Sequence, residues 1–294
     1  MNNEKPLISV VVPAFNEEKY LPACLTSIRN QTFKDFELIV VDNNSTDLTA
    51  TIAKRYGARV VTEERQGMTP ARERGFRESR GSIIARTDAD TQVTYNWLEV
   101  INNTFTKWPK LIAITGPWLS PFKRIPDKIT KQYSYVLSVK LGKLLTGTVH
   151  LLGPNMAIRK TAWEKIKVHM DDKQVHEDID LSCHLSEVGK IRYIPRMQII
   201  CSARKIEKNP LKGLSTYVGE YPIRYIRTLY LHKSILRINK KELIEVIKKK
   251  IPYLPGLVNN RYTNKKIKIK NPYEMIKFKL PLPKSGKIKF KSRI

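Results

Sequence analysis

The N-terminal part of the chain alternates between short apolar runs and longer segments whose apolar positions recur at helical spacing. The apolar runs are rich in β-branched residues and continuous, which predicts strands buried on both faces of a parallel sheet. They are Leu7–Val12, Glu37–Val41, Arg59–Thr62 and Ile83–Arg86. Their β-α-β-α-β-α-β order with short connections is typical of a doubly wound α/β fold with helices on both faces of the sheet.

Local signals set the expected ends of the helices between these strands. Asn16 is expected to cap the first helix, and Ser45 or Thr46 the second. Gly57 is expected to close the second helix, and Pro70 suits the first turn of the third. The loops at the strand ends are therefore predicted to be short and well defined.

Polar side chains follow three of the predicted strands. Asn16 and Glu17 follow the first, Asp42 the second, and Asp88 with Asp90 the fourth. The carboxyl ends of parallel strands meet at one edge of a sheet, where ligands collect. Two aspartates spaced i, i+2 could hold a hard divalent cation that shares its shell with phosphates. The alternative is a polar turn whose carboxylates cap the next helix.

The usual phosphate-binding loops are absent from the sequence. No Gly-x-Gly-x-x-Gly follows the first strand, and no Gly-Lys-Ser/Thr loop occurs. This argues against dinucleotide enzymes and P-loop NTPases. A nucleotide bound at this edge would need its diphosphate neutralised by a metal, and Asp88 and Asp90 could hold Mg²⁺ or Mn²⁺ there.

A second acidic group opens a later helix. Glu177 and Asp178 precede amphipathic positions that run to Gly189, and the helix dipole favours charged carboxylates at this end. Such a carboxylate can serve as a general base, or it can simply decorate the first turn. His176, Cys183 and His184 lie on the same short helix, so they do not make a tetrahedral zinc site and are expected to be structural.

Charge divides the chain into a body and an extension. Of the net charge of +27, residues 1–202 carry +7 and residues 203–294 carry +20. We expect one domain over 1–202, a helical basic extension over 203–260 and a Lys-rich, flexible tail over 261–294. Such an extension suits an anionic partner, either a membrane surface, nucleic acid or an acidic polymer.

Other features bear on location. The sequence has no run of 18 apolar residues and no signal-peptide pattern after Met1. Its three cysteines lack metal-ligand spacing, as in a reducing compartment. We therefore expect a cytoplasmic protein, peripherally attached to the inner face of the cell membrane through its basic region.

Six motifs, in order and spacing, resemble the family 2 glycosyltransferases of the GT-A fold. The resemblance covers about residues 7–202. The motifs are Val12–Glu18, Val41–Asp47, Ala71–Gly75, Thr87–Asp90, Gly153–Arg159 and His176–Leu181.

The resemblance implies roles for individual residues. Asp178 would be the general base, with Glu177 as the second choice. Glu73 stands where relatives often have asparagine, which places a carboxylate near the phosphates unless an arginine pairs with it. The donor site would comprise Pro13, Phe15, Glu17, Asp42, Arg72 and Asp88. Asp88 and Asp90 would bind the metal, with Asp90 as the main ligand. The acceptor side would comprise Gly153, Asn155 and Trp118.

The resemblance, taken with these residues, implies a metal-dependent, inverting transfer of a sugar from a nucleotide donor, most simply a UDP-sugar. The acceptor would be a hydroxyl of a glycan or lipid-linked molecule in cell-envelope polysaccharide or glycolipid synthesis. The alternative is a basic nucleic-acid- or membrane-binding protein with a non-catalytic GT-A-like domain. Nucleic acid is disfavoured because the excess positive charge avoids the part of the chain that carries the motifs. A nucleotidyltransferase would need a Gly/Lys/Arg-rich loop after the first strand, where Pro13–Asn16 stands.

Overall fold

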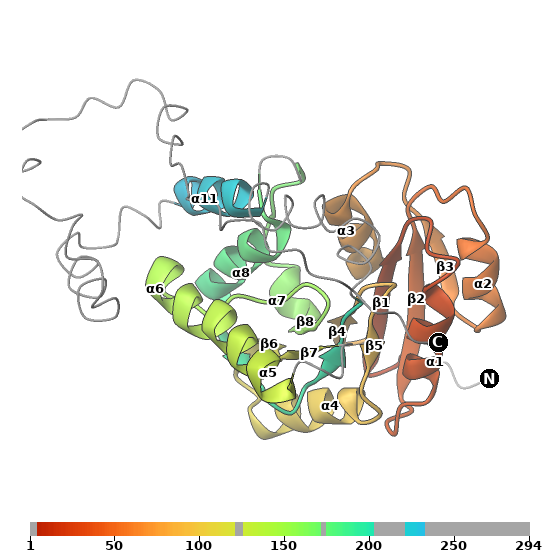
Figure 1. Cartoon of the computed structure of the whole chain (residues 1–294), viewed down its shortest axis with the longest axis horizontal. Helices are drawn as coiled ribbons and strands as arrows, with labels where there is room; N and C mark the ends of the chain where they lie inside the picture. The colour runs from red at the N-terminus through yellow and green to blue at the C-terminus, as the bar shows by residue number, and fades with distance from the viewer. Residues whose placement is uncertain (1–4, 121–125, 172–174, 203–220, 233–294) are drawn as a thin grey trace, which may run out of the picture. The chain divides into compact units, whose positions relative to one another are not determined.

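The computed structural model describes residues 5–120, 126–171, 175–202 and 221–232. They form a seven-stranded sheet in the order β3-β2-β1-β4-β8-β6-β9 and a three-stranded sheet in the order β5-β10-β7 (Figure 1). The large sheet contains β1 (Ile8–Ala14), β2 (Phe36–Asp42), β3 (Arg59–Thr62), β4 (Ile83–Arg86), β6 (Leu111–Thr115), β8 (Met156–Arg159) and β9 (Lys190–Tyr193). The small sheet contains β5 (Gln92–Val93), β7 (Trp118–Leu119) and β10 (Ile199–Ile200).

Helices separate most of the strands along the chain. They are α1 (Leu21–Arg29), α2 (Thr49–Arg55), α3 (Met68–Glu78), α4 (Trp97–Lys107), α5 (Asp127–Tyr135), α6 (Gly142–Thr146), α7 (Lys160–Trp163), α8 (Glu177–Val188) and α11 (Tyr221–Leu231). A π-helical stretch, η1 (Val136–Leu141), joins α5 to α6. All described residues belong to one compact unit.

The sheet is mostly parallel, as the sequence predicts. Strands β3, β2, β1 and β4 pair in parallel, and so do β6 and β9. Strand β8 runs antiparallel to both β4 and β6. This reversal carries the loop before β8 to the edge where β4 ends.

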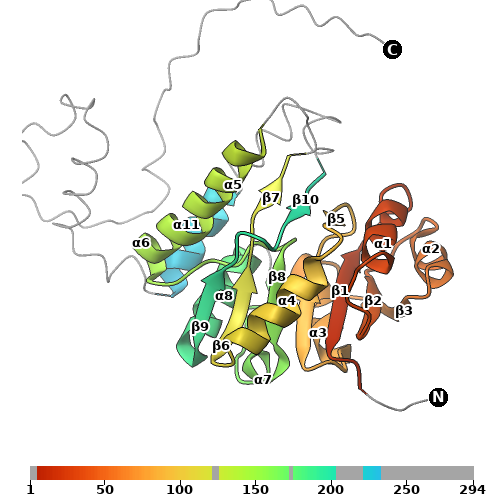
Figure 2. The ribbon, with the colours of Figure 1, turned by 90° about the horizontal axis from the view of Figure 1, so that it is seen from below.

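Side chains alternate between two apolar layers along β1. Val10 and Val12 belong to the cluster that contains α1 and α4, whereas Val11 belongs to the one that contains α3 and α8. Figure 2 shows α4 lying across one face of the sheet. Gly75 of α3 lies so close to β1 and β2 that a Cβ there would overlap Val11 and Val41. Helices therefore cover both faces, which confirms the predicted doubly wound arrangement.

Two expected caps are wrong. Helix α1 begins at Leu21, and Asn16 instead adopts a left-handed φ of 53° in the loop before it. Helix α2 begins at Thr49, with neither Ser45 nor Thr46 as its cap. Asn16 and Ser45 instead form hydrogen bonds across to each other's loops. Gly57 follows α2 with a φ of 71°, as expected for a helix stop.

The later helices include one from the predicted extension. Helix α11 packs against α8, and Pro222 lies in its first turn, where the missing N–H costs nothing. In the described part of the chain, none of the helices has both the length and the apolar character needed to cross a bilayer. The predicted Lys-rich tail at 261–294 lies outside the described residues.

Candidate functional site

The loops after β1 and β2 are joined by hydrogen bonds. The Asn16 N–H donates to Ser45 Oγ at 3.0 Å, and Asn16 Oδ1 accepts the Thr46 N–H at 2.8 Å. The Glu17 N–H donates to Thr49 Oγ1 at 2.8 Å. These bonds hold both loops at one edge of the sheet, where the sequence places them.

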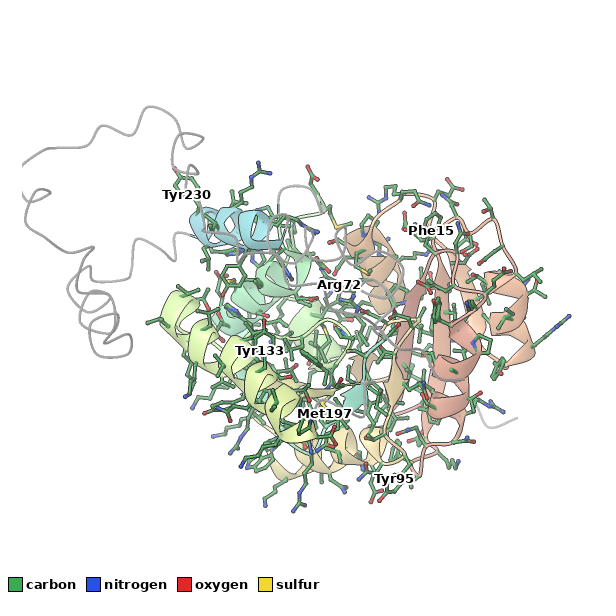
Figure 3. The ribbon with its side chains drawn as sticks, viewed as in Figure 1. Phe15, Arg72, Tyr95, Tyr133, Met197 and Tyr230 are labelled. Atoms are coloured by element: carbon green, nitrogen blue, oxygen red, sulfur yellow. The ribbon has the colours of Figure 1, made fainter. Side chains whose placement is uncertain are left out.

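The residues predicted to bind the donor base and ribose gather at this edge. Asp42 ends β2 opposite Ala14, which ends β1. Pro13 is buried in β1 and Glu17 is buried just beyond it, while Phe15 is 48% exposed (Figure 3). The edge therefore offers one exposed aromatic ring beside two nearly buried carboxylates.

Asn43 fixes the chain that leads into α3. Its Nδ2 donates to the carbonyls of Glu63 and Arg65, at 2.7 and 2.8 Å. Its Oδ1 accepts the Gly67 N–H at 2.9 Å. The sequence motif includes Asn43, but only the fold reveals this bracing role.

Asp88 and Asp90 lie in the turn after β4. Two thiols lie near these carboxylates. Burial, together with the charges of Asp88 and Asp90, raises the pKa of Cys24 far above its usual value and that of Cys201 to about 12. The charge of Glu17 also raises the pKa of Cys24, so the first and fourth strand ends share one electrostatic environment. The donor set is carboxylate oxygen, which Mg²⁺ and Mn²⁺ prefer. These two residues therefore fit the predicted divalent ion.

Arg86 links this turn to α8. Its side chain is 1% exposed, and it donates from Nη2 to Asp88 Oδ1 and from Nη1 to Asp178 Oδ1, both at 3.0 Å. Burial lowers the pKa of the guanidinium, but the carboxylates of Asp88 and Asp178 outweigh this and raise it. Arg86 is therefore a fixed positive charge between the proposed metal ligand and the proposed base.

Asp178 is held from two sides. Its Oδ1 accepts from Arg86, and its Oδ2 accepts the Gly153 N–H at 3.0 Å. Burial raises the pKa of Asp178, and the charge of Glu177 adds to this, while Arg86 opposes it. The result is an oriented carboxylate with an increased affinity for a proton.

Glu177 has the opposite character. Its Oε2 accepts from Arg224 of α11 at 3.2 Å. Burial disfavours its ionised form, but the positive charges of His176, Arg86 and Arg72 hold its pKa below the usual value. Glu177 is therefore poised to remain charged, whereas Asp178 is poised to exchange a proton.

Arg72 lies fully buried between α3 and α8 (Figure 3). Its Nε donates to Glu73 Oε1 at 3.0 Å and its Nη1 donates to the Glu177 carbonyl at 3.1 Å, while Nη2 has no hydrogen-bond partner. Glu73 also accepts from Trp163 Nε1 at 2.9 Å. The carboxylate at position 73 is thus paired, which resolves the concern that it would face the phosphates unpaired.

The structure corrects one acceptor-side assignment. Asn155 has no exposed surface, and its Nδ2 donates to the carbonyls of Pro117 and Met197 at 3.0 and 2.7 Å. Its Oδ1 accepts from Trp97 Nε1 at 2.8 Å. Its amide is fully used in joining three segments, so Asn155 supports the loop and does not contact an acceptor.

Trp118 and His150 also have internal partners. Trp118 is half-buried, packs against the larger apolar cluster and meets Tyr133 edge to face at 6.0 Å. His150 Nε2 lies 2.8 Å from Thr146 Oγ1 and Nδ1 lies 3.3 Å from Tyr225 Oη; burial lowers its pKa to about 4. Internal packing therefore accounts for the position of His150. It also accounts for the buried part of the Trp118 side chain.

Sequence reasoning gave no role to Arg86, the residue that connects the two halves of the site. The sequence does contain a feature that points to Arg86. This charged side chain ends the apolar run Ile83–Arg86, and a buried arginine needs carboxylate partners. Two aspartates follow it at once, but Asp178 lies 92 residues further along the chain. Only the antiparallel placement of β8 beside β4 brings the Gly153 loop, and with it Asp178, to Arg86.

The comparisons with known proteins agree with this arrangement. A family model described as "Glycosyl transferase family 2" matches residues 9–166. The putative glycosyltransferase EpsH of Bacillus subtilis (strain 168) is 34% identical over 106 residues, 34% of this chain and 31% of that protein. The match thus spans about a third of that curated relative.

Two solved structures share the fold. One is TarS 1–349 of S. aureus in complex with UDP-GlcNAc, with a TM-score of 0.53, 20% identity, and coverage of 68% of this chain and 59% of that chain. The other is the mannosyltransferase PcManGT from Pyrobaculum calidifontis in complex with GDP-Man and Mn²⁺, with a TM-score of 0.53, 19% identity, and coverage of 86% and 82%. At these identities the likeness concerns the GT-A fold. Because the family model matches more than half of the chain, this protein belongs to glycosyl transferase family 2.

Proposed function

We propose that this chain transfers a sugar from a nucleotide-sugar donor to an acceptor hydroxyl, with inversion at the anomeric carbon. The observation that carries the proposal is Arg86, whose two 3.0 Å ion pairs tie the Asp88 turn to Asp178. A donor diphosphate bound near Asp88 would leave its anomeric carbon within reach of groups near Asp178. The leaving group and the base would then flank one reacting carbon.

The donor would lie over the ends of β1 and β2. Asp42 would bond the base, with Pro13, Phe15 and Glu17 around base and ribose. UDP is the preferred nucleotide because TarS, which shares the fold, has been solved with UDP-GlcNAc. The unpaired Nη2 of buried Arg72 offers a donor hydrogen bond to a bound anion.

Asp88 and Asp90 would hold Mg²⁺ or Mn²⁺. The PcManGT complex contains Mn²⁺ together with a nucleotide sugar, which supports this choice. Such an ion neutralises the diphosphate as it leaves. Arg86 contributes a further fixed positive charge beside Asp88.

Asp178 would act as general base. As the acceptor oxygen bonds to the anomeric carbon, the bond from that carbon to the diphosphate oxygen breaks and the acceptor proton passes to Asp178. Arg86 and the Gly153 N–H hold the carboxylate in place. Glu177, the second choice, is engaged by Arg224 and serves better as a fixed negative charge.

The acceptor would be a hydroxyl of a glycan or lipid-linked molecule.

We also propose that the protein attaches peripherally to an anionic membrane. Helix α11 exposes Ile226, Tyr230 and Leu231, and residues 203–294 carry a net charge of +20. Apolar and aromatic side chains beside Lys and Arg suit the headgroup region. Flotation with vesicles should show binding to phosphatidylserine-containing bilayers and none to phosphatidylcholine alone; equal recovery with both would contradict attachment.

Calorimetric titration tests the donor site. UDP, GDP and CDP would each be titrated into the full chain with Mn²⁺ and with EDTA. We expect one nucleotide to bind tightly only with Mn²⁺, and Asp90→Asn to abolish that binding. Asp127→Asn, an exposed carboxylate of α5, is the matched control. Binding that is unaffected by EDTA would contradict the metal assignment, and binding of no nucleotide would contradict the proposed function.

A further inference from the structure

Three of the five histidines of the chain surround one carboxylate, away from the proposed active site. His169 lies in the segment before α8, His184 lies on α8, and His232 follows α11. All three face Asp180 of α8. One ligand atom from each of these four residues lies within 4.8 Å of the other three.

The geometry centres on a single oxygen, Asp180 Oδ1. It lies 2.6 Å from His169 Nδ1, 2.8 Å from His232 Nε2 and 3.6 Å from His184 Nε2. The other oxygen, Oδ2, accepts the backbone N–H of His169 at 2.9 Å, which fixes the plane of the carboxylate. Three imidazole nitrogens therefore converge on one oriented anion.

Hydrogen bonding alone leaves this cluster incomplete. Asp180 has no exposed side-chain surface, and His184 Nε2 is buried but, at 3.6 Å from Asp180 Oδ1, lies beyond hydrogen-bond distance. Leaving a buried polar atom without a hydrogen bond is unfavourable. If all three rings were protonated instead, their charges would crowd together: the ring centroids of His184 and His232 are only 4.8 Å apart.

We propose that His169, Asp180, His184 and His232 bind a Zn²⁺ ion. Zinc takes imidazole nitrogen and carboxylate oxygen at about 2.0–2.2 Å in a tetrahedral shell, so ligand atoms of one shell lie about 3.3 Å apart. The present separations bracket this value, and modest side-chain rotations would reach it. The ion would use the His184 nitrogen that now lacks a hydrogen bond.

The ligand set separates this site from the proposed donor site. Asp88 and Asp90 offer oxygen alone and leave room for phosphates, as Mg²⁺ or Mn²⁺ requires. The His169–Asp180–His184–His232 cluster, in contrast, supplies four protein ligands, which fills a tetrahedral shell and marks a structural ion. Cys183 lies outside this group of converging ligand atoms.

The ion would fasten α11 to α8. Near the start of α8, α11 is already held: Arg224 pairs with Glu177, and the His176 N–H donates to Thr228 Oγ1 at 2.7 Å. His232 lies at the other end of α11, and its bond to Asp180 ties that end to α8. The ion would thus help to keep Arg224 on Glu177, beside the proposed base.

Zinc binding to the full chain tests the proposal without an activity measurement. Asp90→Asn is used as the background so that the donor site is disabled. Metal-free protein is titrated with Zn²⁺ in competition with a chromophoric chelator, and separately with Co²⁺. We expect one ion per chain and the intense visible bands of tetrahedral Co²⁺.

Ligand variants then locate the ion. His184→Gln and His232→Gln should each weaken Zn²⁺ binding by more than about 100-fold, the upper end of what losing even an outer-shell partner costs. His176→Gln, directly before the same helix but outside the cluster, should leave Zn²⁺ binding unchanged. Equal binding by His184→Gln and the background protein would overturn the proposal. A six-coordinate Co²⁺ spectrum of the background protein would also overturn it, even if the variants fail to fold.

Discussion

Two aspartates on α8, Asp178 and Asp180, are two residues apart and face opposite sides of the helix. Asp178 faces the sheet, where one guanidinium and one backbone N–H hold it, and burial raises its pKa. Asp180 faces α11; burial also disfavours its charge, but His184, His232 and His169 outweigh this and lower its pKa. At Asp178 burial and the charge of Glu177 outweigh the two donors, whereas at Asp180 the hydrogen bonds from the histidines outweigh burial.

This contrast separates two functions on one helix. A carboxylate with a raised pKa and few donors can take up a proton during a reaction. A carboxylate saturated by donors stays charged and suits a structural ion or a packing role. The same helix can therefore carry both the proposed base and the proposed zinc ligand without interference.

The largest expected effect is that of removing the proposed base. Asp178→Asn should lower kcat by about 10²–10⁴-fold, because the amide cannot accept the acceptor proton. Glu177→Gln should lower it less. Steady-state kinetics with the donor identified by calorimetry measures both. A larger loss of kcat for Glu177→Gln would mean that Glu177, and not Asp178, is the base.

Asp180→Asn provides the opposing test on the other face of the helix. We expect it to lower the melting temperature and to abolish Zn²⁺ binding, with a smaller loss of kcat than Asp178→Asn. A full loss of kcat in a variant that still melts cooperatively would remove the functional distinction between the two aspartates.

Removing Arg86 should have the next largest effect, on stability. Arg86→Gln leaves Asp178 buried without its cation, which costs about 3–5 kcal/mol of the free energy of unfolding. Arg74→Gln is the control: Arg74 pairs with Glu78 on the surface of α3 at 3.2 Å, and an i, i+4 pair of this kind contributes about 0.3–0.5 kcal/mol. Urea unfolding measures both. Similar losses would contradict the central position of Arg86.

The donor half of the fold could be predicted closely, for a physical reason. Strands buried on both faces leave continuous apolar runs, and the observed strand Arg59–Thr62 has the predicted bounds. Polar residues directly after such runs must lie at one edge of the sheet. The shared location of Asp42, Asp88 and Asp90 could therefore be predicted from the order of the strands. The predicted helix caps are wrong because Asn16 and Ser45, 29 positions apart in the sequence, form a hydrogen bond between their two loops.

Features assembled from distant segments left no readable pattern. Along the sequence, His184 stands close to His176 and Cys183. Its neighbours in space are His169 and His232, which are separated by 63 positions and have no characteristic spacing. Asn155 was misassigned for a similar reason, because its partners Trp97, Pro117 and Met197 come from three other segments.

A smaller effect is expected at the loop that holds Asp178. A Cβ on Gly153 would lie 2.5 Å from Asp178 Oδ2 and 2.9 Å from Oδ1, so Gly153→Ala must displace the carboxylate. We expect kcat to fall roughly tenfold or more, since small misplacements of catalytic groups are costly. The affinity for the nucleotide, measured by calorimetry, should be unchanged because the donor loops are untouched.

Gly147→Ala is the matched control. This glycine has a φ of +78° and open space where a Cβ would point. Its replacement should cost about 1–2 kcal/mol of stability through backbone strain and leave kcat alone. If Gly153→Ala also affected only stability, the Gly153 N–H would not position the base.

The smallest expected effect concerns a carboxylate far from α8. Glu37 of β2 accepts from Ser9 Oγ and the Arg80 N–H, both at 2.7 Å, and from Arg59 at 3.1 Å. Burial opposes its charge, but these bonds, led by Ser9, hold its pKa below the ordinary value of 4.5. A carboxylate with a lowered pKa in the folded state stabilises the fold above its unfolded pKa, and this contribution is lost as the pH falls.

Glu37→Gln should therefore destabilise the protein at pH 7 by less than about 1 kcal/mol, because the group is partly exposed. The difference between wild type and variant should shrink as the pH is lowered toward and below 4.5. Urea unfolding at several pH values measures it. A constant difference would mean that Glu37 contributes through packing and not through its ionisation.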